Sequence, residues 1–237
     1  MLLRCWGRQT PTLATSRGHR PGTTTASGGQ PGTGTSAVAG LLWPVVEEAA
    51  VTTPGMTFQL LDDARPSPLA AELEALHAEI YAGPPSGRDD DIALFARRFR
   101  VQHRQPGFVL AEARHGGYLV GYATGMPLRP ATSWWRDLTT DLPDEVTAEY
   151  PGRTFALTGL LVRPAWRRQG TGQALHDLIL RGRPEERATL TVRPAAVPAQ
   201  AALRRWGWRK VARTRDPGPG SDVADVLVLT LPLNREP

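Results

Sequence analysis

Hydrophobic residues follow two different spacings in the central part of the chain. Residues 155–162 form a short apolar run that ends rich in leucine and valine, which predicts a strand rather than a helix. Further along, apolar residues recur at the spacing of one helix face, at Ala174, Leu175, Leu178 and Ile179. The sequence therefore predicts a strand, a short loop and a helix in direct succession.

More helices and strands are predicted on both sides of this unit. A helix is expected to begin at Ser67-Pro68, an N-cap followed by proline at the first helical position, and to end before Gly83. A second helix opens at Asp89-Asp90-Asp91, where negative charge at a helix start is a commoner explanation than a metal site. The remaining expected elements are strands at 57–61, 189–192, 208–213 and 223–231, a β-hairpin over 108–126 and a helix at 198–205.

Helices alternate with strands in this pattern, but without a strict βαβ repeat. Such an order indicates an α/β chain of the α+β type, with a mixed sheet covered by helices. One domain over residues 56–233 accounts for all of these elements. Residues 1–55 are dominated by Thr, Ser, Gly, Pro and Arg, so we expect a disordered low-complexity extension. This extension faintly resembles a transit peptide, and Met56 is an alternative natural start.

Charge and composition narrow the classes of function. The formal net charge is +5, but Lys210 is the only lysine, and the four arginines of residues 1–55 against Glu47 and Glu48 account for +2 of it, which leaves +3 over the rest of the chain, so nucleic-acid binding is not favoured. Cys5 is the only cysteine and the five histidines lack the spacing of metal ligands, so neither a disulfide nor a metal is expected. No apolar run approaches the roughly 20 residues of a membrane span. We therefore expect a cytoplasmic protein without a membrane partner.

The loop between the central strand and helix has the chemistry of a diphosphate site. Arg167-Arg168-Gln169-Gly170-Thr171-Gly172 joins two arginines to two glycines directly before a helix start, whose N–H groups lack partners. A Rossmann turn fits less well, because its first glycine would follow the strand almost at once and Leu175 replaces its third glycine. A P-loop would need Gly-Lys-Ser/Thr, which is absent. A surface loop that merely turns the chain is the remaining alternative.

The Arg-x-x-Gly-x-Gly spacing between a strand and a helix resembles the acetyl-CoA signature of the GNAT family of N-acetyltransferases. The hairpin residues 119–123 look like a strand of that family, and residues 204–209 look like its last helix and glycine-aromatic turn. The resemblance implies a GNAT fold, a mixed sheet of about seven strands flanked by about four helices. It also implies that the fourth and fifth strands splay apart around the pantetheine arm of acetyl-CoA.

By this resemblance, two groups of residues would hold acetyl-CoA, which would act as co-substrate without a metal. The backbone of Leu161, Val162 and Arg163 would bind pantetheine. The diphosphate would be held by Arg167, Arg168, Gln169, Gly170, Thr171, Gly172 and Gln173.

The groups that usually perform catalysis in the family are missing. An amine is mostly protonated at neutral pH, so acetyl transfer to it requires a base. Residues 154–162 contain no carboxylate where the family often has a glutamate, and Leu203 stands where many members have a proton-donating tyrosine. Candidates for these roles are Glu145, Glu149 and Tyr150, with Tyr122 as a further possible proton donor; a solvated acidic loop and a packed tyrosine are the alternatives.

Trp134-Trp135 lies beside these acids in the sequence. The pair suggests a site for an amine-bearing acceptor through cation–π contact, although tryptophans that pack beneath the sheet are the alternative. Two functions therefore stay open. The first is an acetyl-CoA-dependent N-acetyltransferase acting on an amine of a small molecule or peptide. The second is a non-catalytic acyl-CoA-binding or regulatory module with a degenerate active site.

Overall fold

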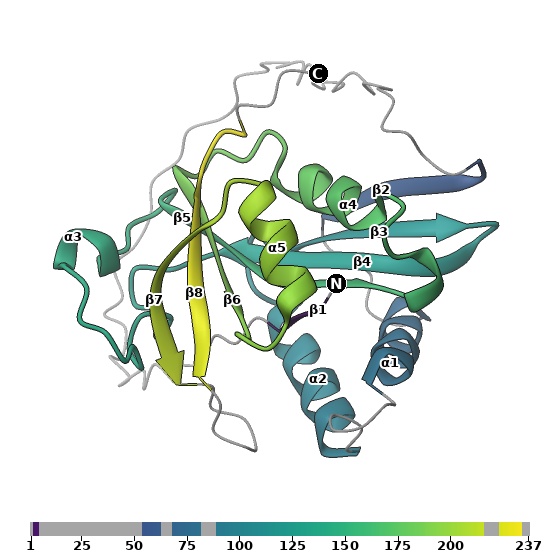
Figure 1. The fold of residues 1–237 in the computed structure, drawn as a ribbon, viewed down its shortest axis with the longest axis horizontal. Coiled ribbons are helices and arrows are strands. Elements are labelled where there is room, and N and C mark those ends of the chain that lie inside the picture. The colour runs from purple at the N-terminus through teal and green to yellow at the C-terminus, as the bar shows by residue number, and fades with distance from the viewer. Residues whose placement is uncertain (1, 5–53, 63–67, 82–88, 216–222, 234–237) are drawn as a thin grey trace, which may run out of the picture. The chain divides into compact units, whose positions relative to one another are not determined.

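A mixed β-sheet with helices on both faces forms the body of the protein (Figure 1). The computed structural model describes residues 2–4, 54–62, 68–81, 89–215 and 223–233, all of which belong to one compact unit. The strands are β1 (Leu2–Arg4), β2 (Met56–Asp62), β3 (Val109–His115), β4 (Tyr118–Pro127), β5 (Thr154–Val162), β6 (Arg187–Val192), β7 (Arg209–Arg215) and β8 (Val223–Thr230). The helices are α1 (Pro68–Tyr81), α2 (Asp89–Gln102), α3 (Asp144–Thr147), the 3-10 turn η1 (Pro164–Trp166), α4 (Thr171–Leu180) and α5 (Val197–Arg205).

The strand order is β2-β3-β4-β5-β6-β8-β7, and β1 pairs with β5 outside this path. The pairing of β5 with β6 is the one parallel pair among the described strands, and the others are antiparallel. The mixed sheet expected from the sequence is thereby confirmed. Each predicted helix and strand is also present, because their hydrophobic spacing was regular. The short helix α3 and the strand β1 were not predicted.

The two faces of the sheet bury two separate hydrophobic clusters. Residues alternate between them along β3, so that Val109 and Ala111 join one cluster while Leu110 joins the other. The first cluster also contains the apolar faces of α4 and α5, and the second contains those of α1 and α2. Figure 1 accordingly shows α1 and α2 together below β3 and β4, with α4 above these strands. The sheet is therefore enclosed between two layers of helices.

Strands β5 and β6 stay together over only a short distance. They pair from Thr154–Ala156 to Arg187–Thr189, after which β6 continues beside β8 while β5 runs on to Val162. On its other side, β5 carries a β-bulge: Thr124 pairs with Gly159 and Gly125 pairs with Leu157, which leaves Thr158 as the extra residue. A bulge bends and twists its strand, so it accompanies the separation of β5 from β6.

The predicted N-terminal extension is only partly within the described residues. Residues 5–53 lie outside them, but Leu2–Arg4 forms β1, which pairs antiparallel with Gly159–Leu161 of β5. The first residues of the chain therefore occupy the part of the β5 edge that lies beyond its pairing with β6.

Candidate functional site

The loop after β5 adopts the unusual backbone that its sequence suggested. The 3-10 turn η1 is followed by Arg168 with φ of 64° and by Gly170 with φ of 82°. Such angles favour glycine, and a non-glycine residue there is uncommon and is often found at functional positions. Gly170 fits because it has no Cβ to clash in this conformation. The loop thus turns the chain sharply into α4 directly beyond the C-terminal end of β5.

Helix α4 begins without a side-chain cap. Gly170 is its N-cap residue, and the first intrahelical hydrogen bond runs from the Ala174 N–H to the Gly170 carbonyl, 2.9 Å between N and O. The N–H groups of Thr171, Gly172 and Gln173 therefore precede the hydrogen-bonded ladder of the helix. These amides and the helix dipole together favour an anion at this end. The diphosphate of a nucleotide is an anion of suitable size and charge.

The arginines near this loop have different surroundings. Arg167 is half-buried, donates from Nε to the Val162 carbonyl at 2.9 Å, and has its pKa lowered by burial, an effect that nearby Tyr81 opposes. Arg168 is exposed at the loop surface. The two arginines lie in the loop directly before the start of α4, which is where the sequence predicts a diphosphate site.

Arg163 is held by the protein itself. Its Nε donates to the Leu119 carbonyl at 2.8 Å, its guanidinium pairs with Glu79 and lies over the ring of Tyr118. Its backbone N–H also donates to the Val120 carbonyl at 2.9 Å, and its carbonyl accepts from Trp166 at 2.9 Å. Of the three residues expected to bind pantetheine, Arg163 thus has its backbone groups already bonded internally. Leu161 and Val162 precede it on the β5 edge that β6 has left, where Leu161 pairs with β1 and the Val162 carbonyl accepts from Arg167.

Comparisons with known proteins identify the family of this chain. The sequence model of the Acetyltransferase (GNAT) family matches residues 70–208, more than half of the chain. The chain belongs to the GNAT family. No significant match was found among curated protein sequences.

Solved structures of similar fold include acetyltransferases. The ribosomal-protein-S18-alanine N-acetyltransferase of Escherichia coli has a TM-score of 0.50 and 16% identity, covering 76% of this chain and 97% of that one. Arabidopsis thaliana NAA60 in complex with a bisubstrate analogue has a TM-score of 0.51 and 19% identity, with coverages of 74% and 97%. The ribosomal-protein-alanine N-acetyltransferase of Brucella melitensis has a TM-score of 0.51 and 16% identity, with coverages of 74% and 99%. At these identities the likeness concerns the fold.

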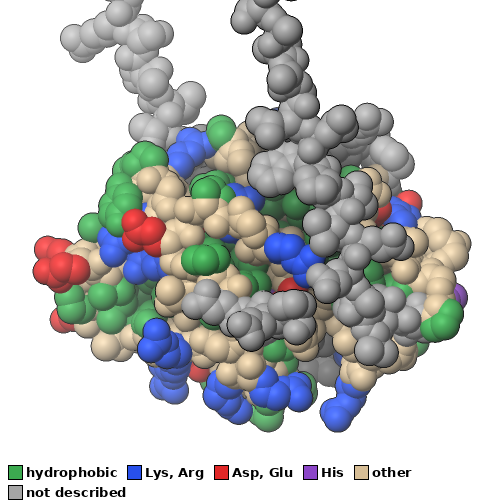
Figure 2. All heavy atoms as spheres, turned by 90° about the horizontal axis from the view of Figure 1, so that it is seen from above, with side chains coloured by type: hydrophobic (Ala, Val, Ile, Leu, Met, Phe, Trp, Pro, Cys, Tyr) green, Lys and Arg blue, Asp and Glu red, His purple; other side chains and the backbone are tan. Residues whose placement is uncertain are grey.

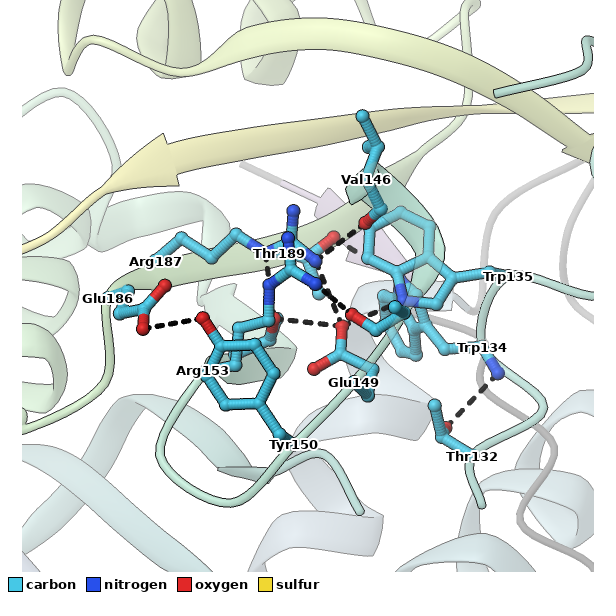
Figure 3. A network of polar contacts seen from close by, with 12 residues as sticks. Thr132, Trp134, Trp135, Val146, Glu149, Tyr150, Arg153, Glu186, Arg187 and Thr189 are labelled. Carbon is cyan, nitrogen blue, oxygen red and sulfur yellow. Dashed lines mark hydrogen bonds and ion pairs between the residues drawn. The ribbon is translucent and has the colours of Figure 1, made fainter. Parts of the chain in front are cut away.

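Glu149, a candidate base, lies within a polar network at the start of β5 (Figure 3). Its side chain is 1% exposed, and Oε1 pairs with Arg187 at 3.0 Å and accepts from Trp135 Nε1 at 2.8 Å and Thr154 Oγ1 at 2.9 Å. Thr154, which Glu149 contacts, is four residues before the bulge at Thr158, or about 13 Å along the strand at about 3.3 Å per residue. This GNAT protein therefore uses Glu149 to join segment 146–154 to β6, and its distance from the bulge weakens the case for a base.

The other two catalytic candidates also lie at this end of the sheet. Tyr150 is exposed and donates its hydroxyl hydrogen to Glu186 Oε1 at 2.7 Å; this bond raises the pKa of Tyr150 (Figure 3). Glu145 is exposed on α3, and its backbone carbonyl accepts from Arg153. Neither residue is brought to the part of β5 that separates from β6.

Trp134 and Trp135 are buried rather than presented to an acceptor. The Trp134 indole donates to Thr189 Oγ1 at 3.2 Å, and the Trp135 indole donates to Glu149. The Arg187 guanidinium already lies over the Trp135 ring, 5.2 Å from its centre. The alternative of tryptophans that pack beneath the sheet therefore describes them better than a substrate site, because their polar groups and one ring face have internal partners.

Sequence analysis missed a buried contact that fixes α4 in place. His176 on α4 is fully buried, accepts at Nε2 from the Trp208 indole at 2.9 Å, and bonds through Nδ1 to Asp177 Oδ1 at 2.7 Å. Its ring also packs against Trp206, 4.6 Å between centres. The glycine-aromatic turn therefore holds the helix whose start is the candidate anion site. In the sequence His176 is a single histidine within a helical pattern, and nothing there indicates Trp208 as its partner.

On the face in Figure 2, Lys and Arg side chains lie in separate small groups among polar and hydrophobic ones. Within the described residues, no helix combines the length and apolar character needed to span a membrane.

Proposed function

We propose that this protein transfers an acetyl group from acetyl-CoA to an amine, by direct attack of the amine on the thioester. The observation that carries the proposal is the uncapped start of α4, flanked by Arg167 and Arg168, at the end of a strand that has separated from β6. The residues present fit acetyl-CoA, because a candidate anion site and a strand edge that β6 has left, and that only the short β1 covers in part, lie in succession along β5. Acetyl-CoA supplies the activated acetyl group.

Each part of the site has a distinct role in the proposal. The N–H groups of Thr171, Gly172 and Gln173, with Arg167 and Arg168, hold the diphosphate. The edge of β5 near Leu161 and Val162 binds the pantetheine amides by backbone hydrogen bonds, as an added strand would. Backbone N–H groups of the same edge polarise the thioester carbonyl. Positioning of the two reactants contributes more to the rate than any single acid or base.

Isothermal titration with acetyl-CoA tests the binding step, and a thiol-release assay tests the chemistry. The amine panel includes a peptide with a free N-terminus, a lysine side chain, a small polyamine and an aminoglycoside. We expect saturable binding and thiol release that depends on one of these amines. If protein shown to be folded does not bind acetyl-CoA at millimolar concentration, the proposal is wrong.

A second candidate function is acyl-CoA binding without catalysis. It is favoured by the lack of a carboxylate in β5 and by Leu203, which is fully buried in α5 and cannot donate a proton. The two candidates differ in one measurement. Tight acetyl-CoA binding without amine-dependent thiol release favours the binding module, whereas amine-dependent release excludes it.

Strand β1 leads to a prediction about the affinity for acetyl-CoA. Leu2–Arg4 pairs with Gly159–Leu161, and a pantetheine arm cannot add to the same strand edge at the same time. Removal of residues 1–9 is therefore expected to lower the Kd for acetyl-CoA by about tenfold, because each backbone hydrogen bond that the ligand must displace is worth about 0.5–1.5 kcal/mol. Calorimetry on both proteins measures the change.

A deletion of similar length elsewhere in the extension is the control for this prediction. Removal of residues 20–28 keeps residues 2–4 and should leave the Kd unchanged. Equal affinity in all three proteins would mean that β1 does not compete with the ligand.

A further inference from the structure

The hydroxyl of Tyr122 is a buried polar group for which the fold alone gives no reason. Tyr122 lies in the middle of β4, is 1% exposed, and its Oη has no hydrogen-bond partner among the described residues. Unpaired buried hydroxyl groups are rare in native proteins, because they lose their hydrogen bonds to water without replacement. A tyrosine at such a position, rather than a phenylalanine without the hydroxyl, points to a role for that hydroxyl.

Gly159 allows the ring of Tyr122 to lie across β5. A Cβ on Gly159 would be 3.6 Å from Tyr122 Cε2 and only 2.7 Å from Thr124 Oγ1. The ring carbon next to the one that bears the hydroxyl therefore lies over the bare backbone of Gly159. Gly159 follows the bulge at Thr158 and lies beyond Ala156, the last residue of β5 that pairs with β6. The phenol thus extends from β4 onto β5 at the level where β5 has separated from β6.

The surroundings keep this hydroxyl protonated. Burial, and to a smaller extent the neighbouring Tyr81, raise the pKa of Tyr122 well above its ordinary value. The ring of Phe95 lies 6.3 Å away between centres, on the same face of the sheet. Tyr81 also acts on the pKa of Arg167, so the same tyrosine is a neighbour of both the Tyr122 phenol and the loop that precedes α4. The Tyr122 phenol is therefore neutral and can donate a hydrogen bond. It lies on the same face of the sheet as Tyr81.

The neighbouring threonine hydroxyl groups already have hydrogen-bond partners. The hydroxyls of Thr124 and Thr158 are 3.1 Å apart and bond to each other. In α5, Leu203 stands at the position where many members of the family have a proton-donating tyrosine. Backbone N–H groups of the β5 edge suit the carbonyl oxygen of a thioester, but the sulfur needs a donor that projects from a side chain.

We propose that the Tyr122 hydroxyl donates a hydrogen bond to the thioester sulfur of the acyl donor and stabilises the charge that forms there during transfer. This inference rests on the proposed function. The amine lone pair forms the new C–N bond, the C–S bond breaks, and its electron pair remains on sulfur. The amine loses its proton to solvent. Tyr122 keeps its own proton, because a thiol with a pKa near 8.5 is a stronger acid than this phenol.

The variant Tyr122→Phe tests the role, because it removes one oxygen and retains the ring that packs over Gly159. The readout independent of turnover is the pKa of the CoA thiol bound to the protein, followed by ¹³C NMR of CoA labelled next to sulfur. We expect this pKa to rise by about one in the variant, since a hydrogen bond to the thiolate is lost. We also expect kcat to fall about 100-fold while the KM for acetyl-CoA changes by less than about threefold.

Tyr118→Phe is the matched control, because it removes a hydroxyl from an exposed position on the same strand. It should leave the thiol pKa and kcat unchanged. If Tyr122→Phe also leaves both unchanged while wild-type protein binds acetyl-CoA and turns it over, the role of Tyr122 is wrong and the proposed function stands. If folded wild-type protein does not bind acetyl-CoA, the function and this inference are both wrong.

Discussion

Replacement of Gly170 by aspartate is expected to weaken acetyl-CoA binding about 100-fold. Gly170 is the N-cap of α4, and no side chain there makes a capping hydrogen bond to the N–H groups of the first turn. An aspartate there adds a negative charge at the proposed diphosphate site. Repulsion of about 1–2 kcal/mol for each nearby phosphate charge gives about 3 kcal/mol in total, which is about two powers of ten in Kd.

The variant Gly170→Asn separates this charge effect from backbone strain. Gly170 has φ of 82°, a conformation that costs any residue with a Cβ about 1–2 kcal/mol but that Asn and Asp tolerate best. Both variants carry nearly the same strain, so the difference between their Kd values by calorimetry isolates the charge. Asp and Asn variants that bind acetyl-CoA within threefold of each other would place the diphosphate away from α4.

The fold was predictable because its elements carry regular hydrophobic spacing. The stripe of Leu175 and Ile179 predicted α4, and both residues are fully buried against the sheet. The glycines of the loop predicted its backbone, since Gly170 adopts the left-handed conformation that favours glycine. Local sequence chemistry therefore determined both the elements and the loop that joins the central strand to its helix.

The contacts that give the site its detail depend on strand register and were not predictable. The bulge at Thr158 arises from the pairing of β4 with β5, and it brings Gly159 beneath the ring of Tyr122. These residues are more than thirty positions apart in the sequence, and no local pattern links them. The same holds for His176 and Trp208, whose hydrogen bond anchors the start of α4. From the sequence alone, Tyr122 could not be distinguished from the other tyrosines as a proton donor.

Glu149 illustrates how a residue type suggests chemistry that its surroundings do not support. A glutamate in an acidic segment is a reasonable candidate base, but Glu149 is bound to Arg187, Thr154 and Trp135 at the start of β5. We therefore expect the variant Glu149→Gln to keep its kcat within about threefold when rates are normalised to folded protein, because a base typically contributes 10²–10⁴-fold. If fully folded Glu149→Gln instead loses 100-fold or more in kcat, Glu149 acts as a catalytic base.

Replacement of Arg187 by methionine is expected to lower the free energy of unfolding by about 3–5 kcal/mol. The side chains of Glu149 and Arg187 are 1% and 13% exposed, so removal of the arginine leaves a carboxylate in the protein interior without its cation. Arg187 also donates to Thr154 Oγ1 at 2.8 Å and to the Val146 carbonyl at 2.7 Å (Figure 3), and those acceptors lose their donor as well. Urea denaturation measures the change.

The double variant Glu149→Gln/Arg187→Met tests the cause of this loss. If the unpaired charge is responsible, neutralising Glu149 should recover about 1–3 kcal/mol relative to Arg187→Met alone, which a double-mutant cycle measures directly. Arg136→Met, at an exposed position in the preceding loop, is the control and should change stability by less than about 0.5 kcal/mol. A double variant no more stable than Arg187→Met would mean that lost packing and hydrogen bonds, rather than the buried carboxylate, dominate. The ion pair would then matter mainly for placing segment 146–154 against β6.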